Sequence, residues 1–241
     1  MKDADPTLFT KLSLRHREGH PQTVAVFQTV AEGFHVPVTD DDRRYWRSML
    51  TVARALDSLV DTNHPASLTH VHNRLIAGLP IAGIEPAEAE TFRDILETVS
   101  PEKHDVIIEG LAINDYAAAI RSTRSFATFL RLRTEEAELF GRIMQLDNPT
   151  QVTATDRFNQ WLPRFARAGY LIDSFGDLSK DLKNGIITFH PSFSRRLRLG
   201  TTALVETKAV VSELPPRTVA RLAVAGVSQI VRNNLTKKSS G

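Results

Sequence analysis

The amino-acid sequence predicts an all-α protein. Apolar residues recur at spacings of three and four in one segment after another, which is the pattern of helices that bury one face. Alternation of apolar and polar residues, the pattern of a half-buried strand, extends over no long stretch. The 241 residues suffice for a sizeable core, and no linker-like stretch divides them. We therefore expect one helical domain over residues 21–235, a partly disordered N-terminal segment over 1–20, and a polar tail over 236–241.

Start and stop signals support several of the expected helices. Thr39 precedes an acidic first turn, Ser100 is followed by a proline at the first helical position, and Pro215 lies at the start of the last helix. Gly185 is expected to end a long helix, within which Pro163 marks either a kink or a late start. The expected helices are residues 21–33, 40–62, 66–78, 87–98, 101–121, 125–145, 153–183, 198–213 and 216–234.

Composition excludes several classes of function. Cysteine is absent, which rules out disulfides and thiolate metal sites and fits a reducing, cytoplasmic environment. No stretch approaches the roughly 20 apolar residues that span a bilayer, so a transmembrane segment is not expected, although peripheral contact with a membrane stays open. The formal net charge is only +2, and the basic residues are scattered rather than clustered. Nucleic-acid binding is therefore disfavoured, whereas an anionic small molecule remains a candidate ligand.

Two of the expected helices carry aspartates four residues apart. Asp57 and Asp61 lie at the edge of an apolar stripe, and Asp173, Asp177 and Asp181 follow one another at the same spacing in the long helix. Residues at this spacing share one face of a helix. A solvent-exposed acidic face is enough to explain the first pair alone. The apolar neighbours of the second group favour an acidic face that borders a cavity.

Carboxylates beside a cavity need a cationic partner, because the burial of unpaired charge is costly. Oxygen ligands without cysteine favour Mg²⁺, which commonly binds a few carboxylates together with phosphate oxygens of a substrate. Zinc bound through His64, His70 and His72 is the weaker alternative. Gly169 and Gly176 lie inside the long helix, where glycine is unfavourable, so we expect a ligand or a neighbouring helix to approach them closely.

The order of these segments resembles the squalene and phytoene synthases, within the wider class I isoprenoid synthase fold. ARALDSLVD resembles the first aspartate-rich motif of that family, and DSFGDLSKDLKNGIITFHP is similar to the second. IIEGLAIND, AELFGRIM and ELPPRTVARLAVAGVSQIVRNNL resemble three further family segments in the same order. Together these segments extend the resemblance over roughly residues 20–235.

The resemblance implies a single-domain helical bundle around a central apolar cavity, with the two aspartate motifs facing each other at its mouth. Members of this family bind prenyl diphosphates through Mg²⁺ and ionise the allylic carbon–oxygen bond. By position, the metal ligands and catalytic residues would be Asp57 and Asp61 in one motif and Asp177 and Asp181 in the other, with Asp173 as a further metal ligand. The candidates for contacts to the substrate diphosphate are Arg43, Arg54, Arg133 and Lys180.

Departures from the family pattern influence which reaction is expected. Asp173 and Gly176 replace the Asn and Arg that lead the second motif, and the chain after Pro191 is shorter than in the family. Arg133, with Gly141 two turns later, is similar to the diphosphate-sensing Arg and helix break of terpene cyclases. We therefore favour a Mg²⁺-dependent terpene synthase that ionises a prenyl diphosphate of farnesyl or geranylgeranyl size. A head-to-head prenyltransferase that couples two prenyl diphosphates is an alternative, as is a non-catalytic relative that acts in assembly or partner binding.

Overall fold

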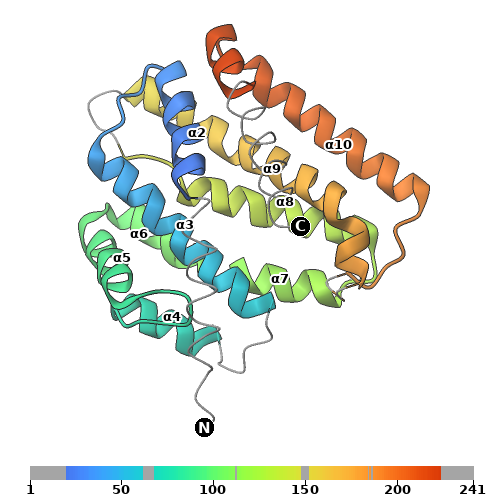
Figure 1. The fold of residues 1–241 in the computed structure, drawn as a ribbon, viewed down its shortest axis with the longest axis horizontal. Helices are drawn as coiled ribbons and strands as arrows, with labels where there is room; N and C mark the ends of the chain where they lie inside the picture. The colour runs from blue at the N-terminus through green and yellow to red at the C-terminus, as the bar shows by residue number, and fades with distance from the viewer. Residues whose placement is uncertain are drawn as a thin grey trace, which may run out of the picture.

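The computed structural model describes residues 20–61, 68–111, 113–147, 152–183, 185 and 187–223, and every regular element within these ranges is an α-helix (Figure 1). The all-α prediction is therefore confirmed. No helix in these ranges has the length and apolar character needed to cross a bilayer. The expectations for residues 1–19, 224–234 and 236–241 lie outside the described residues. The helices are α2 (His20–Gly33), α3 (Asp40–Asp61), α4 (Leu68–Ile76), α5 (Pro86–Thr98), α6 (Pro101–Gly110), α7 (Ile113–Ser122), α8 (Phe126–Ile143), α9 (Val152–Lys183) and α10 (Phe193–Ser212), and a further helical run covers 216–223.

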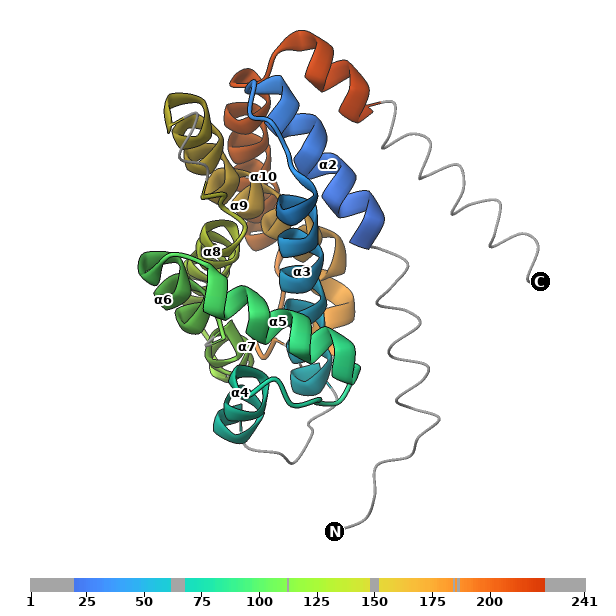
Figure 2. The same ribbon diagram turned by 90° about the vertical axis from the view of Figure 1, so that its left-hand side faces the viewer.

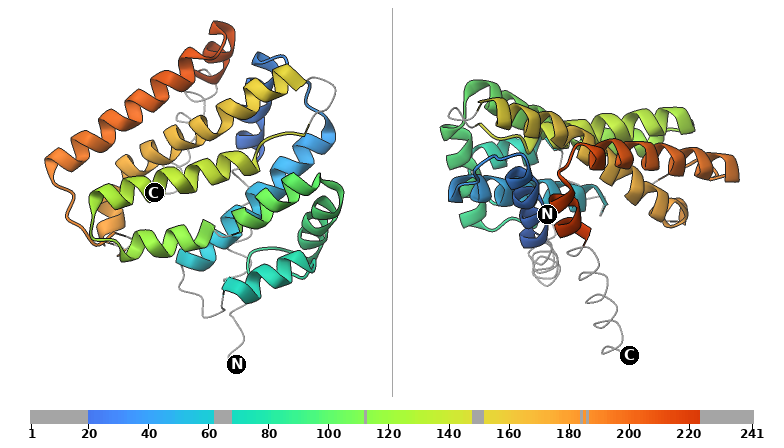
Figure 3. Two further views of the ribbon diagram at one scale, coloured as in Figure 1. Left: turned by 180° about the vertical axis from the view of Figure 1, so that it is seen from behind. Right: turned by 90° about the horizontal axis from the view of Figure 1, so that it is seen from above.

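Four helices lie side by side in the order α7, α8, α9, α10 (Figure 3), and each packs against the next. Helix α3 packs against α2, α5 and α7. Figure 2 shows α2 and α3 in a second layer beside the layer of α8, α9 and α10. Helices α4, α5 and α6 extend the bundle at the end opposite α10, with α6 packed on α8 and α4 on α5 (Figure 1). The long helix α9 is therefore the central element of one layer.

Two buried tryptophans fix the two layers relative to each other. Trp46 of α3 donates a hydrogen bond from Nε1 to the Met144 carbonyl at 2.8 Å, and its ring lies 5.4 Å from that of Phe27 on α2. The Trp46 ring also lies 6.2 Å from that of Phe158 on α9, which joins the two layers. Trp161 of α9 lies 6.1 Å from Phe34, just after α2, while its Nε1 donates to the Val210 carbonyl of α10 at 3.1 Å. Buried indoles of this size contribute a large apolar area and place their single N–H on a partner. The position of α9 against α3 is thus set by packing away from the aspartates.

Pro163 lies inside α9, and the helix is continuous through it, so the alternative of a late start is wrong. A proline removes the backbone hydrogen bond to the carbonyl four residues earlier, here that of Asn159. That carbonyl instead accepts a hydrogen bond from Gln145 Nε2 at 2.9 Å. The Asn159 side chain bonds both backbone groups of Leu146, at 2.9 and 2.8 Å. The segment that follows α8 therefore replaces the hydrogen bond that the proline removes.

The helix signals read from the sequence are confirmed at three places. The Thr39 hydroxyl accepts a hydrogen bond from the Asp42 backbone N–H at 3.1 Å, while the Asp42 carboxylate accepts from the Thr39 N–H at 2.8 Å, which is a reciprocal cap. Ser100 caps α6 by accepting from the Lys103 N–H at 3.2 Å. Gly185, just beyond α9, has a φ of 71°, the left-handed conformation that glycine adopts after helices.

One expected helix, 101–121, is wrong, because the structure divides it into α6 and α7. Helix α6 ends at Gly110, and the Leu111 N–H bonds the carbonyls of Ile107 and Ile108 in a tightened last turn. A Cβ atom at Gly110 would lie only 2.2 Å from Cδ1 of Ile143 on α8. The break therefore coincides with a close approach of α6 to α8. Apolar periodicity continued across this break and gave no sign of it.

Two smaller expectations also differ from the structure. Helix α10 begins at Phe193, five residues before the expected start, and Ser192 with φ of −60° and ψ of 160° takes the extended conformation of an N-cap. Pro191 and Ser192 together are a start signal that the periodicity alone did not include. A Cβ atom at Gly169 or Gly176 would meet nothing within 4 Å, so of the two alternatives a close neighbouring helix is wrong, and the approach of a ligand stays a prediction.

Candidate functional site

A cavity of about 530 Å³ lies between α3, α7, α8 and α9, with a contribution from the start of α2. It is lined by charged and apolar side chains together. Residues that are far apart in the sequence meet here because the tryptophan-anchored layers place one face of α3 opposite one face of α9. The residues that line it are Thr23, Leu50, Ala53, Arg54, Asp57, Ala117, Ile120, Arg121, Arg133, Glu136, Phe140, Gly169, Tyr170, Asp173, Ser174, Asp177, Lys180 and Asp181.

Four of the five predicted aspartates line this cavity. Asp57 comes from α3, and Asp173, Asp177 and Asp181 come from successive turns of α9. The prediction that the three aspartates of α9 share one face is therefore confirmed. Asp61 is the last residue of α3, and its side chain lies outside the described part of the structure. Carboxylates from two helices thus meet at one cavity, although their motifs are more than 100 residues apart.

Two of the α9 carboxylates are in surroundings that oppose ionisation. Burial, and then the neighbouring charge of Asp177, raises the pKa of Asp173, although Arg133 and Lys180 act in the opposite direction. Burial also raises the pKa of Asp181, whose residue is only 7% exposed, and Arg133 again offsets part of this effect. Carboxylates that repel one another in a partly dry site are stabilised by added positive charge. Positive charge added beside Asp173 and Asp181 would therefore favour their ionised forms.

Three of the four predicted cations line the cavity, and one does not. Arg54, Arg133 and Lys180 all border it. Lys180 Nζ lies 3.3 Å from Asp177 Oδ2, an exposed pair three residues apart on α9. Arg43 lies instead near the start of α3, about 21 Å along the helix from Asp57, at 1.5 Å per residue. There its guanidinium pairs with Asp40 at 2.6 Å and donates to the Val38 carbonyl.

Arg133 projects from α8 and forms the most buried ion pair of the cavity. Its Nη1 donates to Glu136 Oε2 at 2.8 Å, and the two side chains are 19% and 8% exposed. Burial raises the pKa of the Glu136 carboxyl, and the arginine lowers it again. Arg133 Nε is buried and has no hydrogen-bond partner among the described residues. The guanidinium therefore retains hydrogen-bonding capacity beyond Glu136.

Sequence reasoning missed Glu136 and Tyr170 as residues of this cavity. Glu136 belongs to the segment LRLRTEEA, which has the composition of an exposed helix face. Tyr170 packs its ring 6.0 Å from that of Phe140 on α8. Burial, followed by the charges of Glu136 and Asp57, raises the pKa of Tyr170 well above its ordinary range, so its hydroxyl stays protonated at neutral pH. The position of Tyr170, one turn before Asp173, was the available signal.

The donor set of the cavity suits a hard divalent cation such as Mg²⁺. Its acidic oxygen ligands are carboxylates, three of them, Asp173, Asp181 and Glu136, have raised pKa values, and no cysteine is present. In the ranges that the structure describes, no three histidine, aspartate or glutamate side chains already converge on one metal position. Magnesium commonly uses one or two protein carboxylates together with phosphate oxygens and water, so these residues fit a cation that binds with an anionic ligand.

A small apolar cavity adjoins the charged one. It has a volume of about 20 Å³, and Ala53 and Phe140 border both cavities. Met49, Phe92 and Ile107 are among the side chains that surround it. The charged cavity therefore has as its neighbour a small apolar space between α3, α5, α6 and α8, which side chains almost fill.

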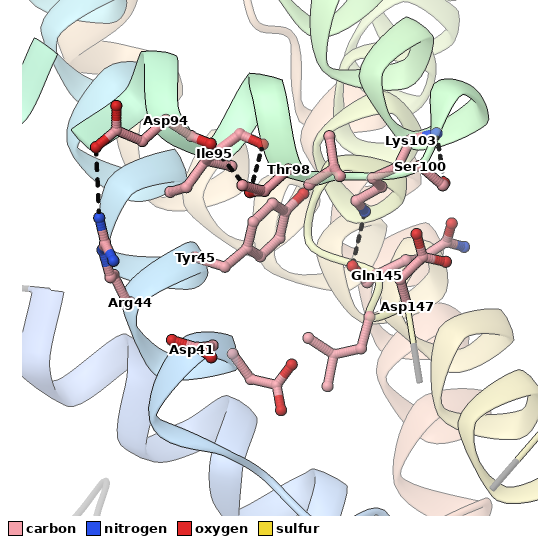
Figure 4. Close-up of a pocket in the computed structure, with 13 residues that line it drawn as sticks. Asp41, Arg44, Tyr45, Asp94, Ile95, Thr98, Ser100, Lys103, Gln145 and Asp147 are labelled. Carbon is pink, nitrogen blue, oxygen red and sulfur yellow. Dashed lines mark hydrogen bonds and ion pairs between the residues drawn. The ribbon is translucent and has the colours of Figure 1, made fainter. Parts of the chain in front are cut away.

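A separate cavity of about 430 Å³ lies where the start of α3 meets α5, α6 and the end of α8 (Figure 4). Lys103 is buried there, and its ammonium donates to the carbonyls of Arg142, Ile143 and Gln145 at 3.1, 2.8 and 2.6 Å. The Tyr45 hydroxyl donates to the Ile143 carbonyl as well. These hydrogen bonds satisfy carbonyl groups at the carboxyl end of α8 and hold that helix end in place.

A scan against models of known protein families, a search of curated proteins and a search of solved structures each returned no match to this chain.

Proposed function

We propose that this chain is a Mg²⁺-dependent class I terpene synthase, folded as a single-domain helical bundle, that ionises a prenyl diphosphate of farnesyl or geranylgeranyl size. The observation that carries the proposal is the cavity that Asp57 of α3 and Asp173, Asp177 and Asp181 of α9 line together. Arginine and lysine side chains border the same cavity. Such a site suits an anionic group that binds together with a cation.

The residues have distinct roles in this proposal. Asp57 and the three aspartates of α9 would hold magnesium, which when bound supplies positive charge against the departing diphosphate. Arg133, fixed by Glu136, and Lys180 would orient the diphosphate oxygens. Because these cations are positioned before the substrate binds, they can stabilise charge that develops on the leaving oxygen without reorganisation.

The apolar part of the lining suits the prenyl chain. Leu50, Ala53, Ile120 and Phe140 border the same cavity as the aspartates. Aliphatic and aromatic walls exclude water, which would otherwise capture an allylic cation. The apolar interior behind Ala53 and Phe140 gives the direction in which the chain would extend. With its diphosphate beside the carboxylates and its hydrocarbon chain directed toward α6, the substrate would contact both the charged and the apolar lining of the cavity.

The test is incubation of the purified protein with Mg²⁺ and with geranyl, farnesyl or geranylgeranyl diphosphate, each supplied singly. Released pyrophosphate and the mass of the extracted hydrocarbon are measured, with EDTA-treated protein as the control. We expect pyrophosphate release and a terpene with the carbon number of its substrate. A product of twice that carbon number would instead identify head-to-head coupling. The absence of pyrophosphate release from all three substrates would contradict the proposal and favour a non-catalytic role.

A further inference from the structure

Helix α10 presents an unpartnered apolar stripe along the outer edge of the bundle. Phe193, Leu197, Leu204 and Val211 are 80%, 56%, 70% and 41% exposed. At 3.6 residues per turn these four side chains fall within an arc of about 40°. Helix α10 lies at the edge of the bundle and packs along α9 (Figure 1). The stripe therefore runs the length of a helix whose other face is buried.

The stripe continues onto α9. Phe175 is 46% exposed, and a Cβ atom at Gly200 of α10 would lie 3.0 Å from its ring. Ile172, one turn earlier on α9, is 52% exposed. Both lie on the side of α9 turned away from Asp173 and Asp177, roughly 100 to 160° around the helix. The apolar surface thus spans two helices and faces outward, away from the charged cavity.

The charged residues of α10 are mostly cations. Arg195, Arg196, Arg198 and Lys208 are its basic residues, and its single acidic residue, Glu206, pairs with Arg167 of α9 at 3.1 Å. Arg198 and Lys208 are exposed and form no ion pair with the described part of the chain. A face that combines apolar side chains with uncompensated cations complements an anionic lipid surface.

A second copy of the chain suits this face less well. A two-fold axis at the middle of the stripe would pair α10 with itself in antiparallel order. Lys208 of one copy would then approach Arg195 and Arg196 of the other, and like charges across an interface oppose association. Anionic headgroups meet the same cations with opposite charge. We propose that α10, with Ile172 and Phe175 of α9, docks the protein on the surface of a membrane that contains anionic lipid.

The test is flotation of the full-length protein with vesicles of phosphatidylcholine, either alone or with about one third phosphatidylglycerol. We expect binding to the anionic vesicles, weaker binding to the neutral ones, and loss of binding at high salt. The double variant Leu197→Gln with Leu204→Gln should bind at least about tenfold more weakly, because each change removes apolar contact with the lipid. The matched control is Leu79→Gln, an exposed leucine far from α10 in sequence, which should bind as the parent protein does.

A second pair of double variants separates the contribution of charge to vesicle binding from that of apolar contact. Arg198→Gln with Lys208→Gln should remove the preference for anionic lipid, whereas Arg47→Gln with Arg124→Gln should leave it unchanged. The absence of flotation with either vesicle would overturn the proposal. So would a dimer in analytical ultracentrifugation that Leu197→Gln with Leu204→Gln dissociates. A third outcome is a parent protein that does not bind vesicles and a double stripe variant with a much lower melting temperature. This would mean that other residues of this chain cover the stripe, and it would also overturn the proposal.

Discussion

The aspartates that line the charged cavity differ in their immediate partners. Asp177 has Lys180 at 3.3 Å, whereas burial raises the pKa values of Asp173 and Asp181. In the proposed cation site, these differences would give each carboxylate a separate role. Asp177 lies in the middle of the α9 series, between two carboxylates that benefit from added positive charge.

Removal of a single carboxylate from the cavity is expected to abolish turnover. Asp57→Ala and Asp177→Ala should each lower kcat by at least about 100-fold, because groups that hold or orient a catalytic cation contribute at this level. Helical content by circular dichroism should stay unchanged. The control is Asp105→Ala, whose carboxylate is 87% exposed on α6. Unaltered activity in both cavity variants would contradict the assignment of these residues to the site.

The raised pKa values predict how stability changes with pH. Between the ordinary carboxyl pKa of 3.8 and the raised pKa of Asp181, the folded state binds more protons than the unfolded state. The contribution of Asp181 to the free energy of unfolding therefore decreases as pH rises through this window. Thermal unfolding without divalent cation should show this trend, and Asp181→Asn should weaken it.

Magnesium should reverse this trend, because a bound cation favours the ionised carboxylates. The increase in melting temperature on addition of MgCl₂ should be larger at pH 7 than at pH 5. NaCl at equal ionic strength is the control for screening. An equal effect of both salts at both pH values would show that no specific divalent site forms.

The aspartates could be predicted from the sequence because helical spacing alone places them on one face. Glu136 could not be, because its position depends on how α8 packs against α9, whereas Tyr170 had only its place one turn before Asp173 as a signal. In the sequence, the buried pair of Arg133 with Glu136, three residues apart, looks as ordinary as the exposed pair of Arg131 with Glu135, four residues apart on the same helix. Only the face of α8 on which each pair lies separates the two.

At the scale of elements, the contact between α8 and α9 depends on one glycine. A Cβ atom at Gly141 would lie 2.4 Å from the Cα atom of Pro163 and 2.7 Å from its nitrogen, and neither backbone atom can move aside easily. Gly141→Ala is therefore expected to destabilise the fold by about 1–3 kcal/mol. Urea unfolding followed by circular dichroism gives the measurement.

The matched control for Gly141 is Gly176, which also lies inside a helix. A Cβ atom there would meet nothing within 4 Å. Gly176→Ala should stabilise the protein by about 0.5–1 kcal/mol, because alanine loses less conformational entropy in a helix. Equal effects of the two substitutions would contradict the close packing of α8 on Pro163.

The sequence also left the limits of some elements undetermined. Caps at Thr39 and Ser100 have local chemistry and were predicted correctly. The division of 101–121 into α6 and α7 depends on a contact of Gly110 with Ile143, which lies on another helix. Long-range packing of this kind leaves no periodic trace in the sequence, since both halves keep the same apolar spacing.

At the scale of the whole molecule, the charged cavity joins the two layers of the bundle. Asp57 belongs to one layer and the α9 aspartates to the other. A ligand that contacts both should stabilise the folded state as a whole. At about 100 times its Kd this stabilisation is about 2.7 kcal/mol, which raises the Tm of a chain of this size by roughly 5–10 °C.

Mg²⁺ with inorganic pyrophosphate should therefore raise the melting temperature more than the sum of their separate effects. Differential scanning fluorimetry of the full-length protein provides the measurement, and Asp177→Ala is the variant in which the joint effect should disappear. Additive effects of the two ions would indicate that they bind at independent sites.

The hydrogen bonds that accommodate Pro163 also bear on how the chain folds. Asn159 bonds Leu146 across a separation of only 13 residues, so closing this loop costs little chain entropy. Helices α8 and α9 thus form a helical hairpin of low contact order, and the hydrogen bonds between Asn159 and Leu146 lie at the end where the two helices are connected. We expect it to form early, ahead of the contacts that join α2 and α3 to α9. Asn159→Ala should then slow folding while leaving the unfolding rate almost unchanged, as stopped-flow chevron plots would show.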